Sequence, residues 1–242
     1  MENKGLNIAV IGSSGSIGGE FVRQLSNDDK VASIFAFSRS VIEFSDDKIS
    51  SHFIDLESEE SIKLAAEIAS AKSKIDMVIV ATGMLHDQET QPEKSLRDLS
   101  PEKFHKLFTI NTIAPAILAK YFLPKLNKEQ KSVFAALSAR VGSISDNKLG
   151  GWYSYRASKA GLNMILKNAS IEISRSNKNA IIIGLHPGTV DSQLSKPFQG
   201  AVANGKLFTP QNCVSQLLEV INNLNISDTG NIFDFNGLKI DF

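Results

Sequence analysis

The chain has 242 residues, of which 42% are hydrophobic and 21% charged, a composition typical of a globular protein with a substantial core. Its 26 basic and 26 acidic residues cancel, so net charge gives no general attraction to nucleic acid or an anionic membrane. A single cysteine, Cys213, excludes an intrachain disulfide. The N-terminus lacks a secretory apolar core, and no uninterrupted apolar run approaches the roughly 18 residues that span a bilayer. These features predict a cytoplasmic protein without membrane or nucleic-acid partners.

Apolar runs typical of buried parallel strands alternate with helix-like segments along the chain. The strand candidates are residues 7–11, 33–37, 52–54, 77–80, 132–137, 180–185 and 232–235. Helix candidates start near Ile17, after Ser58, at Ser100-Pro101 and at Thr209-Pro210. One face of a further, long helix is marked by Leu162, Ile165, Leu166, Ala169 and Ile173. This order predicts an α/β fold: a single doubly wound Rossmann-type domain over residues 1–242, with a mainly parallel sheet of about seven strands and helices on both faces.

Glycines recur at Gly12, Gly15 and Gly18 in the stretch IGSSGSIGGE, which follows an apolar strand and leads into a helix. In a dinucleotide-binding turn, the first glycine permits the tight turn, the second lets the backbone approach the pyrophosphate, and the third lets the helix pack on the strand. The helix N-terminus then offers unpaired N–H groups to the phosphates. The predicted contacts are Gly12, Ser14, Gly15, Ser16, Ile17 and Gly18. The alternative is a turn of small residues that binds no ligand.

The end of the second strand indicates which dinucleotide binds. An Asp or Glu there binds the ribose 2′-hydroxyl of NAD, whereas an Arg accommodates the 2′-phosphate of NADP. Here the strand ends at Ser38 and Arg39 without a carboxylate, which favours NADP(H). The alternatives are an exposed surface arginine or an NAD(H) enzyme of the same fold. Later strand ends predict cofactor contacts at Asp55 and Leu56 beside the adenine and at Ala81, Thr82 and Gly83 beneath the cofactor.

Tyr155 and Lys159 lie four residues apart in YSYRASK, so they share one face of the predicted helix. A neighbouring ammonium favours the phenolate, and we therefore expect Lys159 to lower the pKa of Tyr155. The pair then serves as a general acid or base: in a reduction the tyrosine gives its proton to a carbonyl oxygen, and in an oxidation the step reverses. Taken alone, the same spacing also fits two solvated residues at a helix start.

The glycine turn near residue 12 and the Y-x-x-x-K pattern at residue 155 together resemble the short-chain dehydrogenase/reductase family over nearly the whole chain. Three further stretches match in the family's order: FTINTIAP, FAALSARVG and HPGTVDS. Within the family, the stretches GGWYSYRASKAGLN and HPGTVDS most resemble the branch that includes C-factor cell–cell signalling proteins and bacterial carbonyl-reductase-like members. The resemblance implies an NADP(H)-dependent oxidoreductase that transfers hydride between nicotinamide and a small carbonyl or alcohol substrate. Its alternative is a C-factor-like signalling or NADP(H)-binding regulatory protein with weak or no turnover.

The resemblance also implies roles for individual residues. Asn111 would hold a water in a proton relay to Lys159, and both Tyr155 and Lys159 would contact the cofactor. The nicotinamide carboxamide would be bound by Pro187, Gly188, Thr189 and Val190. Related proteins often pair through helices near residues 101–127 and 152–176, which predicts a homodimer or homotetramer.

The sequence departs from the family pattern at three places. Ser16 takes the place of a glycine, and Ala81-Thr82-Gly83 replaces the usual Asn-Ala-Gly. The third departure is the most serious, because the position of the family's catalytic serine falls on Ala139. Ser138 is one residue earlier and would face the other side of a regular strand. We assign the catalytic serine to Ser138, with Ser143 as the second candidate if the chain curls.

The segment 188–208 mixes Gly, Pro, Ser and Lys without a clear period, which predicts a substrate loop. Phe198 and Phe208 within it either close over an apolar substrate or anchor the loop to the core. Trp152 either lines the substrate pocket or packs at the helix start, and His86 either touches substrate or lies in a surface loop. The four histidines and the one distant cysteine show no metal-ligand spacing, so we expect no metal site.

Overall fold

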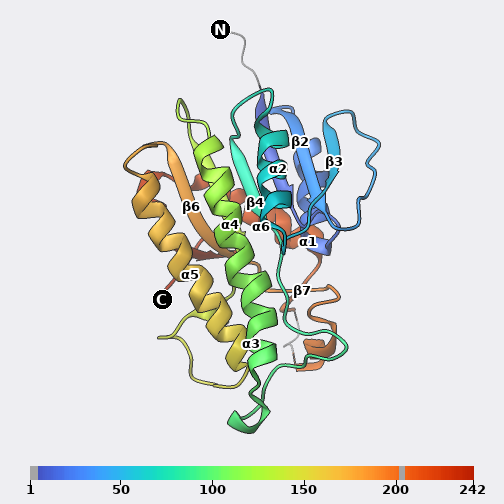
Figure 1. The fold of residues 1–242 in the computed structure, drawn as a ribbon, viewed down its shortest axis with the longest axis vertical. Coiled ribbons are helices and arrows are strands. Elements are labelled where there is room, and N and C mark those ends of the chain that lie inside the picture. Colours follow the sequence, from blue (N-terminus) through green and yellow to red (C-terminus); the bar gives the residue numbers. More distant parts are fainter. Residues whose placement is uncertain (1–4, 202–204) are drawn as a thin grey trace.

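Eight strands form one sheet in the computed structural model, which describes residues 5–201 and 205–242 (Figure 1). They are β1 (Leu6–Ile11), β2 (Val31–Ser38), β3 (Ile49–Phe53), β4 (Met77–Val80), β5 (Ser132–Leu137), β6 (Ala180–His186), β9 (Ile232–Asp234) and β10 (Lys239–Ile240). Their order is β10-β9-β6-β5-β4-β1-β2-β3, and every neighbouring pair is parallel except β9 and β10. The chain runs outward from β1 in both directions, which confirms the predicted doubly wound arrangement.

The predicted strands are all present, and two details differ. β3 covers Ile49–Phe53 rather than 52–54, because it is an edge strand whose polar Ser50 and Ser51 do not read as an apolar run. β10 is an additional antiparallel strand of two residues, too short to leave a periodic pattern in the sequence. Both differences lie at the margins of the sheet, far from its central strands.

Helices cover both faces of the sheet, which is why its central strands are apolar throughout. On one face lie α1 (Ser16–Ser26) and α6 (Pro210–Asn223), and on the other lie α2 (Glu59–Ser70), α4 (Ala114–Phe122) and α5 (Tyr153–Ile173) (Figure 1). β4 and β5 are consequently buried at every position. The predicted helix starts are also confirmed, because the side chains of Ser58, Ser100 and Thr209 each accept a hydrogen bond from the backbone N–H three residues later.

A continuous helical run, Pro101–Lys125, is made of α3 (Pro101–Phe108), a π-helical turn (Thr109–Ile113), α4 and a final short turn. It is long and apolar enough to cross a membrane by length and composition alone, but 50% of its most apolar window is buried inside the fold. Leu118 and Phe122 pack into the core beneath α2 and the sheet. The apolar character of this run is therefore explained by packing against the rest of the chain.

The carboxyl ends of β1, β4, β5 and β6 lie at one edge of the sheet, because these strands are parallel neighbours. The glycine turn follows β1, the Ala81-Thr82-Gly83 segment follows β4, and Ser138 and Ala139 follow β5. The winding direction reverses between β1 and β4, which is where sheets of this kind bind ligands. The fold thus gathers at one edge the segments to which the sequence assigned function.

Candidate active site

The glycine turn is built by close backbone packing. Gly12 has φ +90°, and a side chain there would lie 2.9 Å from the carbonyl oxygen of Ala81. A side chain at Gly18 would collide with the carbonyl oxygen of Gly12. Gly15 precedes the first residue of α1 and has only the Gly12 carbonyl within 4 Å of its would-be Cβ. The first and third glycines are therefore required by packing, and the second leaves the helix N-terminus open.

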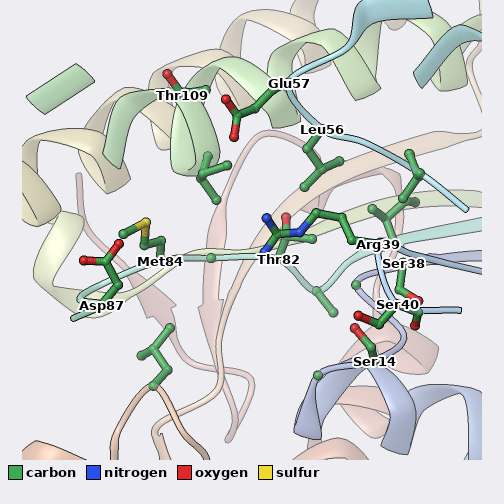
Figure 2. A pocket seen from close by; sticks show the side chains of 18 of the residues that line it. Ser14, Ser38, Arg39, Ser40, Leu56, Glu57, Thr82, Met84, Asp87 and Thr109 are labelled. Atoms are coloured by element: carbon green, nitrogen blue, oxygen red, sulfur yellow. Dashed lines mark hydrogen bonds between the residues drawn. The ribbon is translucent and has the colours of Figure 1, made fainter. Parts of the chain in front are cut away.

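A cavity of about 610 Å³ lies above this turn (Figure 2). Ten of the predicted cofactor residues line it: Gly12, Ser14, Gly15, Ser38, Arg39, Asp55, Leu56, Ala81, Thr82 and Gly83. Four separate segments of the chain thus converge on one cavity, as the motif order predicts. Other predicted residues do not line it: Ser16, Ile17, Gly18, Tyr155, Lys159, Pro187, Gly188, Thr189 and Val190.

The residues outside the cavity have identifiable positions. Ser16 is exposed in the first turn of α1, and Ile17 packs against the core. Thr189 and Val190 form a short strand, β7, which pairs with β8 (Leu207–Phe208). Gly188 has φ +72°, and a side chain there would press on Phe208. The Pro-Gly segment is therefore held by packing beside the cavity.

Arg39 is a cationic side chain that directly follows the carboxyl end of β2. It is exposed, lines the cavity and projects into it (Figure 2). Within the described residues it forms no ion pair. The adjacent Ser38 donates a hydrogen bond of 2.7 Å to the carbonyl oxygen of Ser40, which shapes the turn that carries the guanidinium. The arginine is thus free to bind an anion in the cavity.

Thr82 presents an unusual polar atom to the same cavity. Its Oγ1 is buried and has no hydrogen-bond partner among the described residues. Buried hydroxyl groups are nearly always hydrogen-bonded, so an unpartnered one beside a cavity indicates a place for a ligand. The Gly12 backbone, the Thr82 hydroxyl and the Arg39 guanidinium together provide the polar surface expected of a phosphate-bearing ligand site.

Tyr155 and Lys159 share the inner face of α5, as their spacing predicts, and both are buried. Lys159 Nζ lies 6.0 Å from the centre of the Tyr155 ring and donates a 2.8 Å hydrogen bond to the carbonyl oxygen of Leu137. Burial raises the pKa of Tyr155 to about 12 and lowers the pKa of Lys159 to about 8. The expected lowering of the Tyr155 pKa is therefore wrong here, because desolvation outweighs the neighbouring ammonium. The tyrosine is a neutral phenol at pH 7.

Asn111 lies in the π-helical turn between α3 and α4 and is fully buried. Its Oδ1 accepts a 2.8 Å hydrogen bond from the Met84 N–H, and its Nδ2 donates to the Met84 carbonyl and to Ser158 Oγ. Gly83 separates it from the lysine: a Cβ there would lie 3.4 Å from Lys159 Nζ and 3.7 Å from Asn111 Oδ1. The structure thus brings Asn111 and Lys159 together around Gly83.

Both candidate serines have hydrogen-bond partners within the chain. Ser138 is buried and donates a 2.5 Å hydrogen bond to Asn163 Oδ1, whereas Ala139 packs in the apolar cluster that contains Tyr155. Ser143 accepts a hydrogen bond from Asp146 N and contacts Ser145 Oγ. Ser138 and Ala139 point to opposite sides at the end of β5, as successive strand residues do. Ser138 thus connects the end of β5 to α5, and its assignment as the catalytic serine stays a prediction.

The substrate-loop segment is more ordered than its sequence suggests, with β7, a 3-10 helix (Lys196–Ala201) and β8; residues 202–204 lie outside the described part. Phe208 packs on Phe235 with ring centres 4.6 Å apart, so it anchors the loop. Phe198 lies 5.1 Å from Trp152, which lies 6.1 Å from Tyr155. Phe208 therefore anchors the loop to the core, whereas Phe198 lies in the aromatic group next to Tyr155. Trp152 contacts Tyr155 directly.

His86 joins the same aromatic group. Its ring centre is 5.5 Å from that of Phe198, and its Nε2 lies 3.0 Å from the carbonyl oxygen of Leu194. The cavity is also lined by Gln193 and Leu194 of the predicted substrate loop. Further lining residues were not predicted from the sequence: Ser40, Glu57, Met84, Leu85, Asp87, Lys106, Thr109 and Ile110. Most of them lie within a few residues of a predicted strand end or of Asn111. A prediction that included the three or four residues after each strand end and the few residues before Asn111 would cover most of these positions.

The fold and this cavity define a dinucleotide-binding α/β protein, and comparison with known proteins gives its family. The chain matches the family model for short chain dehydrogenases over residues 6–202. It is 32% identical over 178 residues to 1-hydroxy-2-glutathionyl-2-methyl-3-butene dehydrogenase of Rhodococcus sp. (strain AD45), which is 73% of each chain. The protein belongs to the short chain dehydrogenase family, as its motifs predict, and is an oxidoreductase of that family.

Two further likenesses bear on the branch and the fold. C-signal of Myxococcus xanthus is 31% identical over 146 residues, which cover 60% of this chain and 82% of that protein. The structure of NADPH-bound carbonyl reductase from chicken fatty liver matches with a TM-score of 0.85 at 22% identity, over 98% of this chain and 95% of the reductase. The first supports the predicted resemblance to the C-factor branch, and the second confirms the Rossmann-type fold.

Proposed function

We propose that this protein is an NADP(H)-dependent reductase of a small carbonyl compound, with Tyr155 as the general acid. The observation that carries the proposal is the juxtaposition of a polar, glycine-floored cavity with a buried Tyr155–Lys159 pair at the same sheet edge. The chicken carbonyl reductase with bound NADPH, which shares this fold, supports the choice of cofactor and reaction. The buried phenol supports the reductive direction, because its raised pKa keeps the proton that a reduction consumes.

The residues of the cavity fit NADP(H). The Gly12 turn and the N-terminus of α1 would hold the pyrophosphate, with Thr82 and Gly83 beneath the cofactor. Arg39 would pair with the 2′-phosphate, since the end of β2 offers a guanidinium and no carboxylate. Asp55 and Leu56 would border the adenine. The Pro187–Val190 segment would contact the carboxamide, as the family resemblance implies.

When bound, the cofactor supplies the hydride that the carbonyl carbon receives. Tyr155 donates its phenolic proton to the carbonyl oxygen, which becomes the alcohol hydroxyl. The Lys159 ammonium stabilises the resulting tyrosinate, and its own pKa of about 8 leaves it mainly protonated at neutral pH. Asn111, next to Lys159 across Gly83, would complete the proton relay to solvent. Ala139 offers no hydrogen bond, so the carbonyl oxygen depends on Tyr155 alone.

The direct test is an absorbance assay of NADPH oxidation by the purified protein with a panel of aldehydes and ketones. We expect carbonyl-dependent turnover with NADPH and slower turnover with NADH at equal concentration. Heat-denatured protein is the matched control. If no carbonyl compound in the panel accelerates NADPH oxidation, and no alcohol accelerates NADP⁺ reduction, the enzymatic proposal fails.

A second function is favoured by one specific observation, the alanine at position 139 in a relative of C-signal. In this alternative the protein binds NADP(H) for signalling or regulation and turns substrate over weakly. It predicts micromolar or tighter NADPH binding by calorimetry together with a turnover that is unchanged when Tyr155 is replaced by Phe. A clear dependence of turnover on Tyr155 would contradict it.

The proposed assembly is a homodimer or homotetramer formed through α4 and α5. Met164 and Ile171 of α5 and Ile113, which directly precedes α4, are exposed. A groove between the two helices is lined by Ala116 and Ile165 among others. Exposed apolar side chains on two adjacent helices are typical of a subunit interface. Light scattering after size-exclusion chromatography would test this, and a mass of one chain, 26.3 kDa, would contradict it.

A further inference from the structure

Trp152 has a backbone conformation that bulky residues rarely adopt. Its φ is 51° and its ψ is 42°, in the left-handed region, and it is the one non-glycine residue with positive φ among residues 5–201 and 205–242. It follows Gly150 and Gly151, which are also left-handed. A bulky side chain in this region indicates local strain, and such strain is found mainly where a precise side-chain position serves function.

Glu93 provides the contacts that hold this conformation. Its backbone carbonyl accepts a 2.6 Å hydrogen bond from Trp152 N. Its carboxylate accepts hydrogen bonds from Ser154 Oγ at 2.5 Å and from Ser154 N at 3.3 Å. Glu93 is 1% exposed and has no ion pair within the described residues, so the N-terminus of the 21-residue α5 is its compensating positive charge. Glu93 thus binds the backbone at Trp152 and at Ser154, two residues later, and so holds the turn that carries the indole.

The indole held in this way belongs to the surroundings of Tyr155. Trp152 meets Tyr155 at 6.1 Å with the ring planes 70° apart, and it meets Phe198 at 5.1 Å. Apolar side chains also pack around Tyr155: Met84, Leu85, Leu107, Ala139, Val141 and Leu194. Asp87, a carboxylate of the loop after β4 that lines the cavity, is paired with Lys106. A substrate carbonyl at Tyr155 therefore has its flanking group among aromatic and aliphatic side chains.

We propose that Trp152 is the residue that recognises the substrate, that it selects carbonyl compounds whose flanking group is uncharged and aromatic, and that Glu93 is its positioning residue. The inference rests on the proposed function, since Tyr155 defines where the carbonyl oxygen lies. An aromatic flank gains edge-to-face contacts with the Trp152 and Phe198 rings. A carboxylate in the same place loses its hydration among these apolar side chains, which disfavours binding.

Trp152 is the chain's single tryptophan, so its fluorescence reports on this place alone. The first experiment titrates aldehydes into the protein saturated with NADP⁺, where no reduction can follow. The probes are benzaldehyde, cyclohexanecarbaldehyde and 4-carboxybenzaldehyde. We expect each bound probe to change the emission, with cyclohexanecarbaldehyde about threefold weaker than benzaldehyde and 4-carboxybenzaldehyde at least about 100-fold weaker. Equal affinities for benzaldehyde and its 4-carboxy derivative would overturn the inference.

The second experiment measures kcat/KM for benzaldehyde and cyclohexanecarbaldehyde with NADPH in variants. Trp152→Phe keeps a ring, and we expect it to retain the preference for the aromatic aldehyde, whereas Trp152→Ala should abolish it. Leu149→Ala is the matched control, because Leu149 is 92% exposed in the same loop. Unchanged selectivity in Trp152→Ala would refute the role of the indole.

Glu93 is tested by the same selectivity ratio. Glu93→Ala should lower the preference for benzaldehyde about as much as Trp152→Ala does, while the Kd of NADPH stays within about twofold, since Glu93 does not line the cavity. Glu93→Gln keeps an oxygen acceptor for Ser154 and should restore most of the preference. If Glu93→Ala does not fold, Ser154→Ala provides the second variant. A loss of activity without a change in selectivity would show a merely structural role.

The outcomes separate this inference from the proposed function. If all three aldehydes are reduced equally well and the rate still depends on Tyr155, the inference fails while the reductase assignment stands. If neither these aldehydes nor any compound of the wider panel is turned over, the reductase assignment fails, and the fluorescence titration still decides whether Trp152 recognises aromatic carbonyl compounds.

Discussion

The two ends of the site are built in different ways. At the cofactor end, the Gly12 turn, Thr82 and Gly83 come from strand ends that adjoin in the sheet, and their function depends on backbone geometry and small side chains. At the substrate end, Trp152 and Phe198 come from irregular segments and meet through aromatic contacts. The first end is determined by the sheet itself, whereas the second depends on how loops pack on each other. Substrate preference can therefore change without disturbing dinucleotide binding.

The largest expected effect separates the two ends. Replacing Tyr155 with Phe removes the phenolic proton and keeps the ring, so we expect kcat for carbonyl reduction to fall roughly 10²–10⁴-fold. The Kd of NADPH, measured by calorimetry, should change little, because the variant leaves the glycine turn and Arg39 intact. Equal rates for the variant and the natural protein would remove Tyr155 from the mechanism.

The reverse experiment alters the cofactor end. Arg39→Ala should weaken NADPH binding roughly 10- to 100-fold, the usual worth of a charge-assisted hydrogen bond to a phosphate. NADH binding should stay the same, because it has no 2′-phosphate. The measurement is a titration of both cofactors against both proteins. Should NADH bind the natural protein as tightly as NADPH does, and should Arg39→Ala leave both unaffected, the choice of NADP(H) would be wrong.

A gain of function is expected at the position that faces Tyr155. Ala139 is buried in the cluster around the tyrosine, so Ala139→Ser would place a hydroxyl where a carbonyl oxygen can accept its hydrogen bond. We expect kcat to rise by up to about tenfold, the worth of one added hydrogen bond. Ser138→Ala is the informative comparison and should lower thermal stability rather than kcat selectively, because Ser138 binds Asn163. A lower kcat in Ala139→Ser would contradict this arrangement.

The pH dependence of the reduction should follow the lysine. Burial lowers the pKa of Lys159 to about 8 and raises that of Tyr155 to about 12. The ammonium is present below pH 8 and lost above it, while the phenol keeps its proton throughout this range. We therefore expect kcat to fall by about half at pH 8 and further above it, as measured at saturating NADPH. A kcat that rises between pH 7 and pH 9 would contradict this order of protonation.

The smallest expected effect concerns the departure from the family's glycine pattern. Ser16 is exposed and does not line the cavity, so Ser16→Gly should change the Kd of NADPH by less than about twofold. The sequence predicts a contact between this residue and the cofactor, and the titration tests it. A weakening of tenfold or more would show that the Ser16 side chain binds the phosphates, and that the cofactor end depends on more than its backbone.

The sequence alone determined the features that rest on local pattern. Alternating apolar runs predicted the parallel sheet, and glycine spacing predicted the turn after β1, because buried strands and tight turns impose their requirements on neighbouring residues. The four-residue spacing of Tyr155 and Lys159 placed them on one helix face for the same reason. The edge strands were predicted only in part, because β3 contains the polar residues Ser50 and Ser51 and β10 is only two residues long.

Only the tertiary structure decided what depends on contacts between distant residues. The packing of the end of β5 on α5 directs the Ser138 hydroxyl to Asn163 and places Ala139 in the cluster around Tyr155. The tertiary structure raised the pKa of Tyr155, because burial outweighed the nearby ammonium. It also brought Glu93 beneath α5, which fixes Trp152. Such pairings leave no periodic trace along the chain, because each is the result of packing between separate segments.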